Sequence, residues 1–367
     1  MRRHRALGII SAAIGVCLAL LCLELAVRLH RGRAPHVQFP TIRPMTYDSG
    51  LGWVPTPGQV SMGTWTSNSD AASIRHNGRS AATIGRPILA VGDSFTFGDE
   101  VEDGETWVAR LEEILDKRVI NAGVGAYGID QAFLRAELLL DQYEPDVVLL
   151  SFVSEDITRT EYAYYPYGRG WKPYFTYENG ALTLRNVPVP QGPAPASSRP
   201  LQPLRRALEY SLLADAVFDR IARRWWRDLP VVRRIHRDGE QVSIDLLARL
   251  DAFTKARRGR FIAIALATNG RIGDNARLPS LVTRARARGI TILDLSTETL
   301  RLRPNQLQDL FLPGGHYSPA MNRAVAERIA AFLQGPLGVL DPPARSRGDP
   351  PELARPFSAF EHDLDPK

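Results

Sequence analysis

One stretch decides the fold of this chain: Pro87-Ile88-Leu89-Ala90-Val91-Gly92-Asp93-Ser94-Phe95-Thr96-Phe97-Gly98. Apolar residues run directly into a Gly-Asp-Ser turn, and an acidic turn then leads into residues 106–115, where apolar positions recur at helical spacing. This pattern predicts a buried strand, a tight turn and a helix. A serine at the end of such a strand lies at the carboxyl edge of an α/β sheet, where ligands usually bind. Ser94 is therefore a candidate nucleophile, although an Asp-Ser pair also commonly caps a helix.

Strand and helix patterns continue to alternate along the chain. Strands are predicted at 118–121, 145–153, 261–266 and 290–295, and helices at 129–139, 242–257, 278–288 and 319–333. Such alternation with short connections predicts a doubly wound parallel sheet.

Residues 157–240 interrupt this alternation. A hairpin is predicted to turn at Asn179-Gly180. A Pro-rich loop at 187–203 and a helix at about 204–226 follow it. The Trp225-Trp226 pair at the end of this helix, flanked by arginines, fits either a membrane surface or a packed helix end with solvated arginines.

The positive charge of the chain is concentrated at its N-terminus. Residues 1–33 hold six arginines and one acid, Glu24, which account for +5 of the formal net charge of +6. The remainder is nearly balanced, so no basic surface for nucleic acid is predicted.

The uncharged run 6–23 approaches the roughly 20 apolar residues that a spanning helix needs. We expect an uncleaved transmembrane anchor with the arginines in the cytoplasm, and the alternative is a cleaved signal peptide. Both cysteines, Cys17 and Cys22, lie in this run, so the rest of the chain has no disulfide and no cysteine metal site.

The block Gly92-Asp93-Ser94-Phe95-Thr96-Phe97-Gly98 resembles the nucleophile block of the SGNH/GDSL hydrolase family. A Leu-Gly-Trp segment at 51–53 resembles one that precedes this block in membrane-anchored members. The resemblance implies a flavodoxin-like three-layer α/β/α parallel sheet, the SGNH hydrolase fold, with Ser94 as nucleophile and no metal or cofactor.

The resemblance also implies a general base and reveals a missing acid. His316 matches the family's last block in place and form, because it precedes an aromatic residue and the final helix. The family's orienting Asp would fall on Pro313 or Gly314, so the nearest acid is Asp309, seven residues upstream. Asp309 would orient His316 only if the loop folds back; a Ser–His dyad is the alternative, and helix capping is another role for Asp309.

Two further positions depart from the family's oxyanion hole, which takes backbone N–H groups and a side-chain amide. Its usual glycine falls on Ala126, with Gly125 one residue earlier, and a backbone donor tolerates this change if φ is negative. Its usual Asn falls on Glu155, which would repel an oxyanion when ionised and donate when protonated. Glu155 could also point away, and Asp156 is expected either to contact substrate beside Gly125 or to pair with Arg159.

The resemblance to the SGNH/GDSL family implies a serine ester hydrolase that deacylates a cell-envelope glycan or lipid ester. An O-acyltransferase and a catalytically impaired scaffold that binds glycan or protein at the membrane are the alternatives. A third alternative is an assembly factor for envelope polysaccharide, in which Trp225-Trp226 contacts the membrane or another protein. The expected organisation is a cytoplasmic stub and anchor at 1–33, a connecting arm at 34–83, a hydrolase domain at 84–335 and a disordered Pro-rich tail at 336–367. The expected location is the bacterial inner membrane, single pass, with the domain facing the periplasm or cell exterior.

Overall fold

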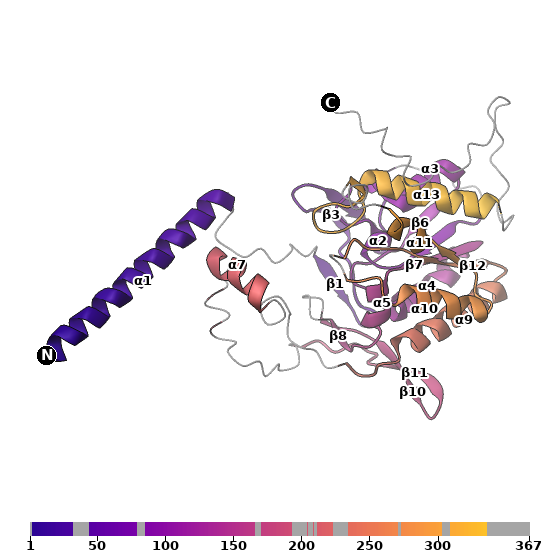
Figure 1. Cartoon of the computed structure of the whole chain (residues 1–367). Helices are drawn as coiled ribbons and strands as arrows, with labels where there is room; N and C mark the ends of the chain where they lie inside the picture. Colours follow the sequence, from indigo (N-terminus) through magenta and orange to yellow (C-terminus); the bar gives the residue numbers. More distant parts are fainter. Residues whose placement is uncertain are drawn as a thin grey trace, which may run out of the picture. The chain divides into compact units, whose positions relative to one another are not determined.

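The computed structural model describes residues 2–31, 44–78, 85–165, 170–192, 204, 208, 211–222, 234–270, 273–302 and 309–335 (Figure 1). The chain divides into two compact units, residues 1–41 with 195–232, and residues 42–194 with 233–367. The predicted tail at 336–367 and the Trp225-Trp226 pair lie outside the described residues.

The first unit contains two described helices, α1 (Arg2–Arg31) and α7 (Leu212–Ile221). Glu24 of α1 accepts hydrogen bonds from the backbone N–H groups of Leu212 and Leu213 at 2.9 and 2.8 Å, and from the Ser211 hydroxyl at 2.8 Å. The only acid of the N-terminal segment therefore satisfies the free N–H groups at the start of α7.

Across the described residues, α1 included, we find no helix with enough length and apolar character to pass through a bilayer. The predicted transmembrane anchor is therefore not supported. The predicted location of the protein is tested by none of these observations and stays a prediction.

The second unit is built on a parallel sheet. Its strands, in spatial order, are β6 (Val119–Asn121), β5 (Ile88–Val91), β7 (Val147–Phe152), β12 (Arg260–Ala265) and β13 (Ile292–Asp294). In chain order this is 2-1-3-4-5, the flavodoxin-like arrangement, with its switch point between β5 and β7. The predicted doubly wound sheet is confirmed.

Helices cover both faces of this sheet (Figure 1). They are α3 (Trp107–Leu115) and α13 (Pro319–Gln334) on one face, and α4 (Ile129–Tyr143), α9 (Gly239–Ala256) and α10 (Leu278–Ala287) on the other. Ile88 and Ala90 of β5 pack into the first layer, whereas Leu89 and Val91 pack into the second. Successive strand residues point to opposite faces, so a continuous apolar run is required where both faces are covered.

Shorter elements lie around this core. They are the helices α2 (Ser94–Phe97), α5 (Ser154–Arg159) and α11 (Ser296–Leu300), the 3₁₀ turn η1 (Asp103–Glu105), and the antiparallel pairs β1 (Met45–Asp48) with β2 (Gly52–Pro55), β3 (Gly58–Ser61) with β4 (Thr66–Ser69), β8 (Tyr164–Tyr165) with β9 (Gly170–Trp171), and β10 (Tyr174–Glu178) with β11 (Ala181–Arg185).

The segment predicted as a connecting arm packs into the sheet domain over its described residues 44–78. Trp53 is 2% exposed and its indole N–H donates to the carbonyl of Gly125 at 3.0 Å. Arg75 is also 2% exposed, and its backbone N–H donates to Asn121 at the end of β6. The segment therefore supplies core and hydrogen-bond partners to the domain rather than only leading into it.

The hairpin β10–β11 turns at Asn179-Gly180, as the sequence predicts. Both residues have positive φ, 49° and 78°, which the favoured two-residue hairpin turn requires. The hairpin packs on the helices beneath it, since Phe175 contacts Phe133 of α4 edge to face with ring centroids 5.8 Å apart.

A fully buried ion pair ties this inserted segment to the sheet domain. Lys172, just before β10, donates to the Asp130 carboxylate at the start of α4, and both side chains have no exposed surface. The same ammonium lies 3.3 Å from the carbonyl oxygen of Arg159. A buried pair of this kind is costly to break on one side only, because the remaining charge is left without a partner.

We therefore expect Lys172→Met to lower the free energy of unfolding by about 3–5 kcal/mol, measured by urea denaturation. The double variant Lys172→Met/Asp130→Leu should recover much of this loss. Lys255→Met removes an exposed lysine paired with Asp251 and should cost less than about 1 kcal/mol. Equal effects of the two single variants would contradict a structural role for the buried pair.

Candidate active site

Ser94 is held by a turn that only glycine allows. The strand β5 ends at Val91, and a Cβ on Gly92 would lie 2.2 Å from the Thr96 hydroxyl oxygen and 2.5 Å from the Ser151 carbonyl oxygen. Asp93 then caps α2 by accepting the Phe95 N–H at 2.9 Å, and Ser94 is the first residue of that helix. The capping role and the nucleophile position are therefore compatible, since Asp93 caps the helix that presents Ser94.

The structure brings His316 to Ser94 from the opposite end of the domain sequence. A short loop between Phe311 and Tyr317, which pair with each other, carries the imidazole, and the His316 carbonyl accepts the Leu312 N–H at 2.8 Å. The Nε2 atom of His316 lies 2.9 Å from Ser94 Oγ. This is the reach that a general base needs to accept the serine proton.

The acid that contacts His316 is Glu100, not the predicted Asp309. Glu100 Oε2 lies 2.8 Å from Nδ1 of His316 and also accepts the His316 backbone N–H at 3.1 Å. With the ring proton on Nδ1, Nε2 is left to accept from Ser94, which is the tautomer a serine base requires. Asp309 is exposed, and the ring nitrogen it was expected to orient is already paired. The prediction for Asp309 is wrong.

Gly314 makes room for this carboxylate. Its N–H donates to Glu100 Oε1 at 2.8 Å, and a Cβ at this position would lie 2.5 Å from both Glu100 carboxylate oxygens. Gly314, two residues before the histidine and one of the positions where the resembled family carries an Asp, has no side chain. The carboxylate of Glu100 occupies the space beside it. Glu100 itself has a φ of +74°, an uncommon backbone conformation for a residue with a side chain.

Sequence reasoning missed Glu100 although two signals pointed to it. The nucleophile block is followed at once by an acidic turn, and the two positions where an acid is expected before the histidine hold Pro313 and Gly314. Together these features describe an acid displaced from one block to the other. The contact spans 216 residues, so neither segment reveals it alone.

The charges around His316 favour its protonated form. Burial lowers the pKa of the imidazole, but the hydrogen bond that its Nδ1–H donates to Glu100 and the charges of Asp99, Glu100 and Asp93 outweigh this effect, so the pKa of His316 is raised above its ordinary value of 6.5. For Glu100, burial raises the pKa of the carboxyl group. Its hydrogen bonds to His316 and Gly314 outweigh burial, so the pKa of Glu100 is lowered. The pair therefore favours a carboxylate beside an imidazolium, the state that follows proton transfer from serine.

The residues expected to form the oxyanion hole differ in how well their backbone conformation and contacts suit a hydrogen-bond donor. The Ser94 N–H begins α2 and has no partner within that helix. Ala126 has a φ of +68°, so the condition of negative φ fails and this alanine occupies a conformation that favours glycine. Gly125 is buried with its carbonyl bonded to Trp53, and its role in substrate binding stays a prediction.

Glu155 is the second residue of α5, and its carboxylate lies against Gly273, where a Cβ would be 3.2 Å from Oε2. Burial raises its pKa, and nearby arginines offset only part of this effect. Glu155 is therefore protonated more readily than a solvated glutamate, and the protonated form is able to donate a hydrogen bond.

The Asp156 carboxylate is buried and bonded within the protein. It is 2% exposed, accepts the Val153 N–H at 2.9 Å and receives Arg159 Nη1 at 2.5 Å. The same Nη1 lies 3.3 Å from Asp93 Oδ2. The predicted Asp156–Arg159 ion pair is confirmed, and the substrate-binding role predicted for Asp156 is wrong because its carboxylate is buried and fully engaged.

No family model and no curated protein matches the chain. Among solved structures it is similar to a protein described as a lipolytic protein of the G-D-S-L family from Desulfitobacterium hafniense, with 13% identity, a TM-score of 0.40, and 68% of this chain and 100% of that one covered. A lipase/acylhydrolase from Enterococcus faecalis shares 16% identity at a TM-score of 0.40, over 70% and 98% of the two chains. An acetylxylan esterase from Geobacillus stearothermophilus shares 14% identity at a TM-score of 0.36, over 70% and 95%.

The solved structures that the chain resembles thus include G-D-S-L proteins, the family that the Ser94 block also resembles. The basis for a function is the geometry of Ser94, His316 and Glu100.

The strained alanine gives a direct prediction. Because Ala126 has positive φ, Ala126→Gly should raise the free energy of unfolding by about 1 kcal/mol, measured by thermal or urea denaturation. Ala132→Gly, at a position inside α4, should lower it by about the same amount. Destabilisation by Ala126→Gly would show that the left-handed conformation is not adopted in solution.

Proposed function

We propose that the chain is a serine ester hydrolase of the SGNH type. The observation that carries the proposal is the continuous chain of contacts from Ser94 Oγ through both ring nitrogens of His316 to Glu100, with steps of 2.9 and 2.8 Å. A nucleophile, a base and an orienting acid in this order are the arrangement that activates a serine hydroxyl near neutral pH. We propose an acyl ester on a cell-envelope glycan or lipid as the substrate.

The proposed reaction has two halves. Ser94 Oγ attacks the ester carbonyl carbon while His316 Nε2 takes its proton, and Glu100 stabilises the imidazolium that forms. The tetrahedral intermediate collapses, the alcohol leaves with the proton from His316, and the acyl group stays on Ser94. Water then attacks the acyl-enzyme with its proton passing to His316, and the carboxylic acid is released as the proton returns to Ser94.

The developing oxyanion would be held by the backbone N–H groups of Ser94 and Ala126, with protonated Glu155 as a third donor. Ala126 adopts the positive φ that glycine adopts readily, so its N–H is proposed as a donor although its φ is not negative. Each good donor of this kind contributes about 10²–10³ in rate. A raised pKa of Glu155 supports the donor role, because the ionised form would oppose the oxyanion.

Glu100 also bears on the alternatives. A binding protein on a decayed scaffold was suggested by departures at three positions, Gly314, Ala126 and Glu155. The first is compensated by Glu100, since the carboxylate is present and in contact with the base. This contact favours an enzyme over a binder. An O-acyltransferase would use the same acyl-enzyme and differ only in the acceptor.

The proposal is tested by p-nitrophenyl acetate and butyrate hydrolysis with the purified full-length protein. Ser94→Ala should lower kcat by on the order of 10⁴–10⁶, because the nucleophile is removed while binding is retained. Ser280→Ala, at an exposed serine bonded to Glu240, is the matched control and should leave kcat unchanged.

Fluorophosphonate labelling separates the remaining outcomes. Labelling at Ser94 without ester turnover would identify a transferase that lacks its acceptor. Neither labelling nor turnover in the wild type would reject an activated serine.

The Glu100 contact predicts a pH dependence. His316 must be neutral to accept a proton, so kcat/KM should rise with pH through its raised pKa, above 6.5. Glu100→Gln removes the carboxylate that raises this pKa, so the rising limb should move to lower pH while the plateau falls by about 10²–10⁴. Asp309→Asn is the control and should change neither. A shifted limb in Asp309→Asn with a normal limb in Glu100→Gln would return the acid role to Asp309.

A further inference from the structure

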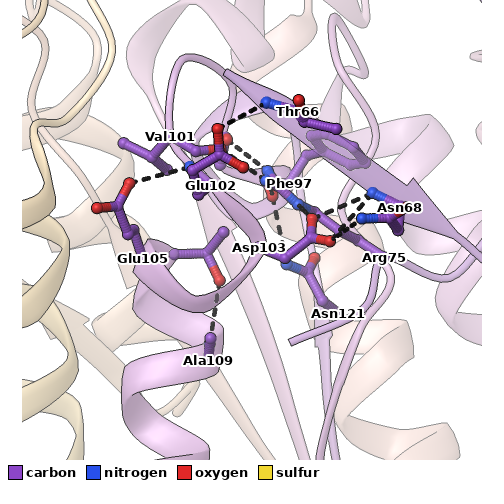
Figure 2. A network of polar contacts seen from close by, with 12 residues as sticks. Thr66, Asn68, Arg75, Phe97, Val101, Glu102, Asp103, Glu105, Ala109 and Asn121 are labelled. Atoms are coloured by element: carbon purple, nitrogen blue, oxygen red, sulfur yellow. Dashed lines mark hydrogen bonds and ion pairs between the residues drawn. The ribbon is translucent and has the colours of Figure 1, made fainter. Parts of the chain in front are cut away.

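Arg75 is a fully buried guanidinium in the segment before the sheet, and all of its described donors reach one loop (Figure 2). Its Nη1 atom donates to the carbonyl oxygens of Phe97 and Gly98 at 2.7 and 2.5 Å. Its Nη2 atom donates to the carbonyl oxygen of Val101 at 2.7 Å, and its Nε atom donates to Asp103 at 2.9 Å.

These contacts bracket the residue that orients the histidine. Gly98 and Val101 stand on either side of Asp99-Glu100, so one planar guanidinium holds both ends of the segment that carries Glu100. The backbone of Glu100 has positive φ, and fixing the segment at both ends maintains such a conformation. The loop is thereby determined by a side chain that never touches His316.

Arg75 is itself anchored on rigid elements. Its backbone N–H donates to the Asn121 carbonyl oxygen at 3.0 Å, which joins it to the edge of the sheet at β6. Its guanidinium carbon lies 4.6 Å from the centroid of the Phe97 ring. Asp103, the carboxylate partner, is held in turn by the Asn68 side chain at 2.7 Å, as Figure 2 shows.

We propose that Arg75 is a positioning residue for the reaction, which acts by holding Glu100 in register with His316. The inference rests on the proposed function and deepens it, because it makes the segment before the sheet part of the catalytic apparatus. A guanidinium suits the task, since its donors lie in a fixed planar fork that satisfies three carbonyls and a carboxylate at once. A lysine ammonium keeps the charge but cannot span the same acceptors.

The test is Arg75→Lys in the full-length protein, alone and combined with Glu100→Gln. Arg75→Lys should lower kcat about 10- to 100-fold with KM little changed, and it should move the rising limb of the pH profile of kcat/KM to lower pH. In the Glu100→Gln background the same change should have little further effect on kcat, because Arg75 acts through Glu100. Full additivity with a wild-type pH limb would overturn the proposal.

Arg135→Lys is the matched control. Arg135 is also a buried arginine, and it donates to the carbonyl oxygens of Ala122 and Ser73 at 2.8 and 2.7 Å without contacting residues 97–103. We expect it to lower stability as Arg75→Lys does, with the pH limb unchanged and its effects additive with Glu100→Gln. If Arg75→Lys does not fold, Asn68→Ala removes one donor to Asp103 and should produce a smaller shift of the limb in the same direction.

A second readout keeps this proposal separate from the proposed function. The His316 imidazole is titrated by NMR in the wild type and Arg75→Lys, with its signal assigned through His316→Gln. A lower His316 pKa in Arg75→Lys supports the positioning role whether or not any ester is turned over. An unchanged His316 pKa overturns it, whereas absent turnover with a lowered pKa counts against the hydrolase alone.

Discussion

The contact between Glu100 and His316 is the interaction on which the site depends. Without it the imidazole has no fixed tautomer, and Ser94 faces a ring that is free to present a donor instead of an acceptor. The contact joins two loops that lie 216 residues apart in sequence, and each loop is also held by further contacts. The histidine loop is closed by the pairing of Phe311 with Tyr317, and the Glu100 loop by the guanidinium of Arg75.

The chemistry of the triad therefore requires a negative charge in the space beside the histidine, but it does not require that the acid come from a particular position in the sequence. One carboxylate must lie beside Nδ1 of the histidine. Because a Cβ on Gly314 would lie 2.5 Å from both Glu100 carboxylate oxygens, an acidic side chain at position 314 and the Glu100 carboxylate in its present place exclude each other. The glycine here is the counterpart of Glu100 and not a loss of function by itself.

The sequence predicted what depends on local patterns. Buried strands such as β5 and β7 are continuous apolar runs, and Ser94 and His316 lie in short motifs with a fixed relation to such elements. Glu100 could not be predicted in the same way, because its partner is distant and its own neighbours are also acidic. Arg75 was missed for a related reason, since a lone arginine in a polar segment is usually solvated, and it is the carbonyls of the α2–η1 loop together with the Asp103 carboxylate that make its burial favourable. The φ of Ala126 was likewise set by the loop and not by the residue.

The negative charge of the acids around Ser94 has to be neutralised by ion pairing or by protonation. Asp93, Glu100, Glu155 and Asp156 all lie in the segments around Ser94, and the proposed reaction would add an oxyanion among them. Arg159 lies between Asp93 and Asp156 and neutralises part of this charge at a buried position, where an unpaired carboxylate would be costly. Glu100 is matched by His316 as soon as the imidazole is protonated, and burial favours neutral Glu155. The four acids thus have different roles. Asp93 and Asp156 pair with Arg159 and support the loops, Glu100 contacts the histidine, and protonated Glu155 is able to donate a hydrogen bond. The number of acids therefore does not preclude an anionic intermediate.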